Sequence, residues 1–486
     1  MKNILQSTNV TMFGKCPIMR SLSVFCLCLV TLGSIKAQET KELDLRITQT
    51  SNGQTLLNWT KLPGDLTYSV ETKSTIHSPW SLLSPSSLAS EFFIAPNSPQ
   101  GFYRVIAQPS SASADINRGR LIASEKVGEV PSLTLQFLLL LLPGLPPDAD
   151  RSVPFNVDLY KITYETVDPA GQSTVASAGL AFPQGVTEPI PVASYQHPTV
   201  LRRTEVPSNP ESSENLGGVF MAAGGFFTVM PDYLGLGESD LFHPFVLAKP
   251  TAIASVDALR AARTFASNQS MTTTDELFLL GYSEGGYATM ALHRELQESH
   301  SDEFTVSASA PMAGPFDLSG TVRDGILNDE TLSQPYQLPY VVGALTHYEP
   351  VGLSFADTLR DDLATTIPRL FNGEISGTEI KEQLPSQPFE ILSDAALSAL
   401  ADPTHPLVLA LQRNDLLDWI PAAPMRLIHC SNDEVVSFQN SQRALEEFQN
   451  QGADAVELVD PGMDLGHLDC AIPSIVAARQ WINSLR

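Results

Sequence analysis

Residues 277–286 have the sequence LFLLGYSEGG, and the fold prediction starts from this stretch. An apolar run ends at Leu280, Ser283 has a glycine two positions to each side, and helical periodicity continues to Glu298. A serine on a sharp turn from strand to helix needs small flanking residues, because strand and helix approach closely there. The helix N-terminus also favours a developing oxyanion. We therefore predict that Ser283 is a nucleophile rather than part of a structural turn.

A serine nucleophile needs a histidine base and a carboxylate that orients it. In folds with this nucleophile turn, the acid and then the histidine follow the serine, each after a later strand. Asp433 comes after the apolar run MRLIH, and His467 comes after the run AVELVD. These positions predict a triad of Ser283, Asp433 and His467. Glu434 is the rival acid, and ordinary polar loop residues are the alternative for each position.

Two cysteines flank the predicted acid and base. Cys430 lies three residues before Asp433, and Cys470 lies three residues after His467. If the acid and the base are hydrogen-bonded, their loops lie side by side and a Cys430–Cys470 disulfide is within reach. The alternative is a pair of buried free thiols.

The oxyanion of an acyl-transfer reaction needs two N–H donors. One is expected from Glu284, directly after the nucleophile. The other is expected from Thr199, in the loop after the run PVASYQ. His197 lies in the same loop but precedes Ser283, so we interpret it as a loop scaffold rather than a base.

Apolar strand candidates alternate with helical stretches from residue 157 onward. Helical periodicity is clear over residues 251–267 and 286–298, and such alternation predicts a mainly parallel sheet with helices on both faces. Residues 319–424 interrupt the pattern, so we predict an inserted cap there. The expected strands are residues 157–167, 174–182, 191–196, 226–233, 276–283, 304–312, 425–431 and 455–460.

The first part of the chain differs in character. Residues 1–37 resemble a secretory signal peptide, with a positively charged start, an apolar run at residues 21–32 and a cleavage site at residues 35–37. The alternative is a transmembrane anchor, for which the apolar run is too short. Residues 41–107 contain short β-branched and aromatic runs between turn signals, and predict a small β-sandwich-like domain with Trp59 and Trp80 in its core. Residues 108–118 are rich in Ser and Ala and predict a linker. Residues 119–486 then form the main domain.

Composition excludes several classes of function. The 486 residues carry a net charge of −25, which argues against nucleic-acid binding. Loss of the leader would leave 25 Lys and Arg against 54 Asp and Glu, or −29. No metal-binding or nucleotide-binding spacing is present, so we expect no metal and no cofactor. The apolar stretch 133–142 predicts a buried or interfacial helix.

An ordered set of motifs is similar to the bacterial branch of the secretory lipases, within the α/β-hydrolase superfamily and related to fungal lipase-A-type enzymes. The motifs are YQHPT, PDYLGLGESDLFHPF, GYSEGG, APMAGPFDLSG, NDEVVSFQNSQ and GHLDC. The resemblance covers residues 119–486. It implies an eight-stranded sheet, an inserted helical cap, and ester hydrolysis through Ser283, Asp433 and His467. Pro198 departs from the glycine usual in that family.

These observations predict a secreted or periplasmic serine esterase or lipase acting on a small-molecule or lipid ester. A serine peptidase of the prolyl-oligopeptidase type is one alternative, but too few residues precede the linker for the large β-domain of such enzymes. A non-catalytic hydrolase-fold binding protein is the other. The N-terminal β-domain could contact carbohydrate or a cell surface.

Overall fold

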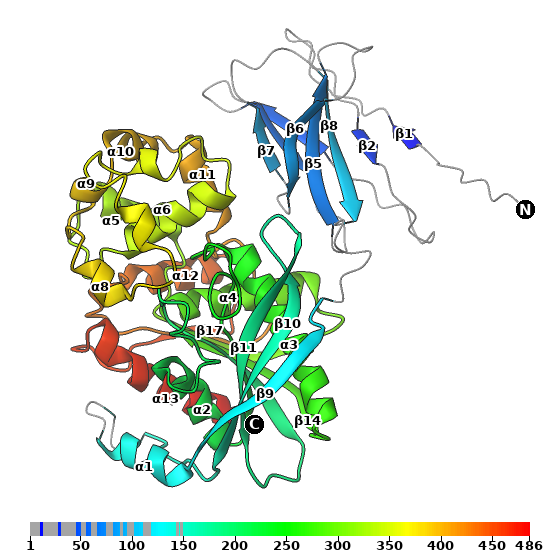
Figure 1. Cartoon of the computed structure of the whole chain (residues 1–486), viewed down its shortest axis with the longest axis vertical. Coiled ribbons are helices and arrows are strands. Elements are labelled where there is room, and N and C mark those ends of the chain that lie inside the picture. Colours follow the sequence, from blue (N-terminus) through cyan, green and yellow to red (C-terminus); the bar gives the residue numbers. More distant parts are fainter. Residues whose placement is uncertain are drawn as a thin grey trace, which may run out of the picture. The chain divides into compact units, whose positions relative to one another are not determined.

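The computed structural model of the chain describes residues 118–141, 145 and 149–486 (Figure 1). Before residue 118 it describes the backbone of eight strands and the side chains of Leu57 and Val105, which are both buried. The chain forms two compact units, residues 1–117 with 167–173 and residues 118–166 with 174–486. The predicted leader cleavage site, most of the linker, and the Trp59 and Trp80 side chains lie outside the described residues.

The first unit contains short antiparallel strands. The bounds of its strands are β1 Val10–Met12, β2 Cys28–Val30, β3 Leu45–Gln49, β4 Thr55–Trp59, β5 Leu66–Lys73, β6 Ser81–Ser87, β7 Glu91–Ile94 and β8 Phe102–Pro109. Strands β3, β4 and β7 form one three-stranded sheet, and β6, β5 and β8 form another. Leu57 lies on β4 and Val105 on β8, so each three-stranded sheet contributes one of the two described buried side chains.

The second unit is built on a nine-stranded mixed sheet with the order β17-β16-β15-β14-β12-β13-β11-β10-β9. Its strands are β9 Leu121–Val130, β10 Val157–Val167, β11 Ser173–Pro183, β12 Ile190–Gln196, β13 Phe227–Pro231, β14 Thr273–Tyr282, β15 Val306–Met312, β16 Met425–Ile428 and β17 Val456–Val459. Neighbours from β13 to β17 run parallel. Each of the eight expected strand intervals coincides with one strand.

The expected count of eight strands was one too few. The missed strand is β9, which pairs antiparallel with β10 at the edge of the sheet. An edge strand packs on few neighbours, and most β9 side chains are exposed or half-buried. Its sequence LIASEKVGEV therefore lacks the unbroken apolar run that identified the central strands.

Helices cover both faces of this sheet (Figure 1). They are η1 Ser213–Asn215, α2 Leu216–Ala223, α3 Ala248–Asn268, α4 Glu284–Ser299, α12 Gln439–Asn450 and α13 His467–Ser484. Alternate side chains of β14 point to opposite faces of the sheet, as in any β-strand. Leu277 and Leu279 pack with the α3 and α4 side, whereas Phe278 and Leu280 pack with α2 and α13. Burial on both faces holds the end of β14 in place.

A run of short helices lies between β15 and β16; it begins at Leu318, one residue before the interval 319–424 for which a cap was predicted, and ends within that interval. Its elements are the π-helical turn η2 Leu318–Val322, α5 Arg323–Leu327, α6 Gln337–Tyr348, η3 Ala356–Thr358, α7 Ile367–Leu370, α8 Gly377–Lys381, α9 Pro388–Ile391, α10 Asp394–Ala401 and α11 Pro406–Arg413. They gather as one group, drawn in yellow to orange in Figure 1. Below, they are called the helical insertion.

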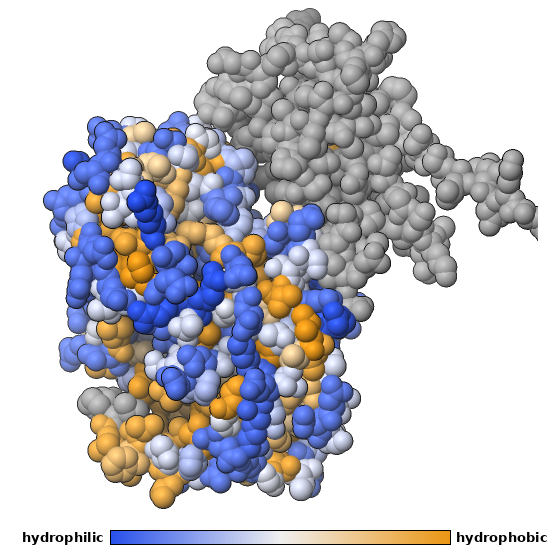
Figure 2. Space-filling model, in the orientation of Figure 1, coloured by the Kyte–Doolittle hydropathy of each residue, from blue (hydrophilic) through white to orange (hydrophobic). Residues whose placement is uncertain are grey.

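Helix α1, Ser132–Leu141, formed where a buried or interfacial helix was expected. Most of its side chains are exposed, so it is not a buried helix, and the interfacial alternative stays a prediction. Only Leu135 and Leu139 are buried, in a cluster that also contains side chains of α2 and α13. The exposed apolar side chains are Leu133, Phe137, Leu138, Leu140 and Leu141. Figure 2 shows apolar surface at the lower left, where Figure 1 places α1. Among the described residues, every helix is too short or too polar to cross a membrane.

Candidate active site

Ser283 lies between β14 and α4 in a strained backbone conformation, with φ of 60° and ψ of −122°. Few residues other than glycine adopt positive φ, and such strain is concentrated at functional sites. The Ser283 N–H donates to the Met312 carbonyl oxygen at 2.9 Å, which ties the turn to the end of β15. Residues 281–286 are called the nucleophile turn below.

The glycines of the nucleophile turn are required by close backbone contacts. A Cβ atom at Gly281 would lie 2.4 Å from the Gly285 carbonyl oxygen. A Cβ at Gly285 would lie 2.0 Å from the Gln196 carbonyl oxygen, and one at Gly286 would lie 2.1 Å from that of Met312. These separations are far shorter than van der Waals contact. The G-x-S-x-G-G pattern therefore reflects how tightly β14, α4 and two neighbouring strand ends pack.

The structure brings the three predicted triad side chains together. His467 Nε2 lies 2.9 Å from Ser283 Oγ, and His467 Nδ1 lies 2.6 Å from Asp433 Oδ2. Because an ionised carboxylate only accepts hydrogen bonds, Nδ1 carries the proton in this pair. Nε2 is then free to accept the serine hydroxyl proton. All three side chains are almost fully shielded: Ser283 and His467 are each 4% exposed, and the Asp433 side chain is 0% exposed.

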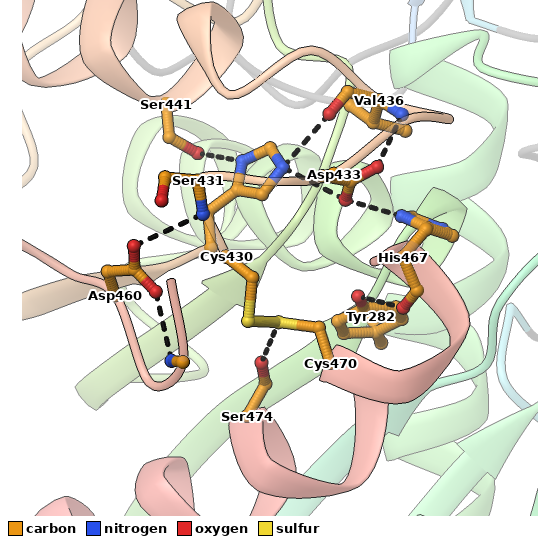
Figure 3. Close-up of a disulfide and its surroundings, with 12 residues drawn as sticks. Tyr282, Cys430, Ser431, Asp433, Val436, Ser441, Asp460, His467, Cys470 and Ser474 are labelled. Carbon is orange, nitrogen blue, oxygen red and sulfur yellow. Dashed lines mark hydrogen bonds and ion pairs between the residues drawn. A yellow bond between two sulfur atoms is a disulfide. The ribbon is translucent and has the colours of Figure 1, made fainter. Parts of the chain in front are cut away.

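The Asp433 carboxylate receives four hydrogen bonds, several of which are drawn in Figure 3. Val435 and Val436 donate backbone N–H groups to Oδ1 at 2.9 and 2.8 Å. His429 Nε2 reaches Oδ2 at 3.1 Å, beside His467. Burial by itself would raise the pKa of Asp433, but the hydrogen bonds from His429 and His467 outweigh burial and hold the pKa well below its usual range. Asp433 is therefore ionised throughout the neutral pH range.

The sequence does not indicate a role for His429, because this residue stands in the apolar run MRLIH, where a histidine is ordinarily a buried core residue. Its Nε2 also lies 3.0 Å from the Val436 carbonyl oxygen. Since that oxygen and the Asp433 carboxylate are both acceptors, His429 Nε2 must carry a proton. Ser441 Oγ lies 2.8 Å from the other ring nitrogen and completes the contacts. His429 thus donates to the same Asp433 oxygen, Oδ2, that His467 contacts.

Glu434, the rival acid, contacts backbone rather than the imidazole ring. Its Oε2 accepts the backbone N–H of His467 at 3.0 Å. A carboxylate at this position satisfies one of the free N–H groups at the start of α13 and complements the helix dipole. Glu434 therefore fixes the place where His467 begins its helix, and Asp433 alone reaches the ring among the described carboxylates.

Cys430 and Cys470 form a disulfide with a Cα–Cα distance of 6.1 Å (Figure 3). It joins the loop that carries Asp433 to the helix that begins with His467. The Tyr282 hydroxyl donates to the His467 carbonyl oxygen at 2.6 Å and ties the same helix to the nucleophile turn. The acid, base and nucleophile loops are thus linked covalently or by a buried hydrogen bond.

Replacing both Cys430 and Cys470 with serine is expected to lower the free energy of unfolding by about 3 to 4 kcal/mol, because the closed loop restricts the unfolded chain. The loop spans 40 residues. Urea unfolding of the double variant beside the oxidised and reduced wild-type protein measures this difference. A loss below about 1 kcal/mol in both comparisons would contradict a stabilising role.

Glu284 and Thr199, the predicted oxyanion donors, line one cavity together with Ser283. Glu284 is the first residue of α4, where backbone N–H groups have no helical partner. The Thr199 Oγ1 atom is buried and has no hydrogen-bond partner among the described residues. The unpartnered Thr199 hydroxyl and the start of α4 thus border the same space as the serine hydroxyl.

His197 is buried behind this loop, and its ring nitrogens lie near the backbone oxygens of Pro198 and Asp232. Its ring stacks on Tyr233 at 4.2 Å between centroids. Burial lowers the pKa of His197 to about 4, so its ring is neutral at ordinary pH. These contacts agree with a scaffold for the loop, while His467 is the histidine that contacts Ser283.

The cavity has a volume of about 340 Å³ and lies between the nucleophile turn and the helical insertion. Most of its wall is apolar. Residues of the insertion that line it include Leu318, Val322, Ile326, Leu338, Val341 and Leu345. Asp433 and Glu434 border it on the other side. Among the described residues no cluster of His, Cys, Asp or Glu is suited to hold a metal ion.

The nine-stranded sheet is that of α/β-hydrolases, as solved structures show. A protein of Legionella pneumophila aligns with a TM-score of 0.70 at 28% sequence identity. The alignment covers 75% of this chain and 98% of the Legionella chain. The rice cell wall degrading esterase LipA from Xanthomonas oryzae aligns with a TM-score of 0.68 at 28% identity, over 76% of this chain and all of its own.

Candida antarctica lipase A shares the fold but is more distant, with a TM-score of 0.58 at 16% sequence identity. The alignment covers 77% of this chain and 84% of the Candida chain. A comparison with curated protein sequences found no match. The model of the secretory lipase family matches residues 219–485, so the chain belongs to that family. It is a carboxylic ester hydrolase, which sets aside the peptidase and the non-catalytic binding protein as alternatives.

Proposed function

We propose that Ser283, His467 and Asp433 are the catalytic triad of a secreted esterase or lipase. His467 Nε2 takes the proton of Ser283 as Oγ attacks the ester carbonyl, and the new C–O bond gives a tetrahedral intermediate. The same proton passes to the departing alkoxide, which leaves as the alcohol and forms an acyl-enzyme. Water, deprotonated by His467, then releases the acid and restores Ser283.

One observation carries this proposal: the His467 ring contacts Ser283 Oγ through Nε2 and Asp433 through Nδ1 at once. An imidazole held in this way has the correct tautomer for accepting the serine proton. The lowered pKa of Asp433 keeps the carboxylate negative, and a negative charge beside Nδ1 stabilises the imidazolium that forms during attack.

The oxyanion is held by the backbone N–H groups of Glu284 and Thr199. The buried, unpartnered hydroxyl of Thr199 supports a third donor in the same place, because a buried polar group without a partner costs about 1 to 3 kcal/mol. Formation of the oxyanion would satisfy that group in the transition state alone.

Thr199→Val, which removes the hydroxyl and keeps the shape and the N–H, is expected to lower kcat about 10- to 100-fold with little change in KM. Thr199→Ser keeps the hydroxyl and is the matched control, expected to stay within about threefold of wild type. Equal rates for the valine and serine variants would limit Thr199 to its backbone donor.

The apolar cavity supports an acyl chain as its occupant, and the helical insertion then serves as the cap of the site. Each methylene that leaves water contributes up to about 0.8 kcal/mol. We therefore expect kcat/KM to rise along a p-nitrophenyl ester series from acetate, by up to about fourfold per methylene, until the cavity is filled. Chromogenic peptides of the same acyl size should not be cleaved. Equal kcat/KM values along the ester series would contradict the assignment of the cavity to the acyl chain.

Export through a signal peptide within residues 1–37 belongs to the same proposal and follows from the short apolar run of the leader. Carbohydrate or cell-surface contact is proposed for the domain at residues 41–107. N-terminal sequencing of protein recovered outside the cytoplasm of the producing cell tests the first point. A mature chain that still begins at Met1 would contradict it.

A further inference from the structure

A buried histidine–glutamate pair adjoins the nucleophile turn. His243 belongs to the loop between β13 and α3, and its Nε2 lies 2.6 Å from Oε1 of Glu284. The two side chains are 2% and 1% exposed. The other ring nitrogen of His243, Nδ1, lies 2.7 Å from the Leu234 carbonyl oxygen. The triad and the oxyanion hole as described above do not use this pair.

The contacts determine the net charge of the pair. A carbonyl oxygen only accepts, so His243 Nδ1 must carry a proton toward Leu234. Nε2 and Oε1 are both acceptors unless one of them carries a proton, and a separation of 2.6 Å requires a hydrogen between them. If that proton is on Nε2, the pair is imidazolium and carboxylate; if it is on Oε1, both groups are neutral. The net charge is zero in either case.

No other described group offers such compensation to Glu284. Its second oxygen, Oε2, is buried without a hydrogen-bond partner among the described residues. Burial, with Glu284 as a further contributor, raises the pKa of four surrounding tyrosines, which therefore stay neutral. They are Tyr233, Tyr287, Tyr336 and Tyr340. His197 also faces Glu284, but burial lowers its pKa to about 4. Asp433 and Glu434, on the same cavity, add negative charge.

The position of Glu284 makes its charge important for catalysis. It directly follows Ser283, and its N–H is one of the proposed oxyanion donors. A bare carboxylate there would repel the negative charge that develops on the substrate oxygen, and such repulsion is strong in a buried site. The same carboxylate, when bonded to His243, connects the nucleophile turn to the loop after β13.

We propose that His243 is a positioning residue that supplies the proton compensating the Glu284 carboxyl group, so that Glu284 anchors the nucleophile turn without opposing the oxyanion. The inference rests on the proposed function, because it takes the Glu284 N–H as an oxyanion donor. The proton in question lies between His243 Nε2 and Glu284 Oε1, and no additional reactant is needed.

A double-mutant cycle with kcat and KM measured across pH tests the proposal. His243→Gln leaves the carboxyl uncompensated and is expected to lower kcat by about 30- to 100-fold with little change in KM. The loss should fall on kcat at each pH, because the uncompensated carboxylate opposes the oxyanion and leaves substrate binding unchanged. Glu284→Gln keeps the N–H but weakens the bond to position 243, and is expected to lose about three- to tenfold.

The double variant decides between charge compensation and simple loss of structure. Once Glu284 is Gln, replacing His243 by Gln should cost less than about threefold in kcat, and the kcat of the double variant should exceed that of His243→Gln by about tenfold. A double variant as impaired as His243→Gln would overturn the proposal. If His243→Gln does not fold, the comparison of the double variant with Glu284→Gln still decides, since a further tenfold loss would contradict charge compensation.

His293→Gln is the matched control for loss of a buried histidine. His293 lies on α4, is 1% exposed and contacts Ser309 rather than Glu284. It should lose stability without changing the shape of the pH profile. Ser283→Ala distinguishes failure of the proposed function from failure of the role of His243. Ester hydrolysis by Ser283→Ala would refute the proposed function. An inactive Ser283→Ala variant, together with a double variant as impaired as His243→Gln, would refute only the role of His243.

Discussion

Ser283→Ala is expected to lower kcat for p-nitrophenyl esters by about 10⁵- to 10⁶-fold, because removal of the attacking oxygen eliminates the acyl-enzyme route. KM should change little, since the cavity and the oxyanion donors remain. Alanine keeps a Cβ at the strained φ of 60°, so the free energy of unfolding should stay within about 1 kcal/mol of wild type.

Steady-state kinetics and urea unfolding of the same preparation measure both quantities. The unfolding curve is the control, because it separates loss of chemistry from loss of fold. Turnover within about 100-fold of wild type by a folded alanine variant would remove Ser283 from the nucleophile role.

Asp433→Asn is expected to lower kcat by about 10⁴-fold while leaving the fold intact. The asparagine amide can donate to His467 Nδ1, which stabilises the tautomer that carries its proton on Nε2 and cannot accept the proton of Ser283. The amide oxygen then takes the Oδ1 position and still accepts the backbone N–H groups of Val435 and Val436, so the loop should keep its position.

Glu434→Gln is the matched control for this prediction, because the neighbouring carboxylate contacts only the backbone N–H of His467. It should lose less than about tenfold in kcat. If Glu434→Gln were impaired as severely as Asp433→Asn, the assignment of the acid would be wrong. Comparison of the two variants under identical conditions therefore tests which carboxylate acts on the ring.

Central strands and the three site residues could be predicted because their patterns are local. Residues 277–280 of β14 are buried and form an unbroken apolar run, and the close backbone contacts at Gly281 and Gly285 require glycine. The order of Ser283, Asp433 and His467 follows from parallel strands whose carboxyl ends share one edge of the sheet.

Other features depend on contacts that no local pattern records. Strand β9 is an edge strand with exposed side chains, so its sequence resembles a loop. His429 stands in a core run, and its contact with Asp433 depends on how the following loop folds back. The His243–Glu284 pair joins residues 41 positions apart, and neither lies in a pattern that predicts the other. Helix α1 is a further case, because its apolar sequence does not show that most of its side chains are exposed.

Labelling with a fluorophosphonate, followed by mass spectrometry of the digested protein, tests the central claim most directly. This reagent reacts with a serine that is activated by a base and held beside an oxyanion hole. We predict one adduct per chain, on the peptide that contains Ser283, with loss of esterase activity in proportion to labelling and no adduct in the Ser283→Ala variant. Full esterase activity in a protein that remains unlabelled, or an inactivating adduct on another residue, would contradict the account.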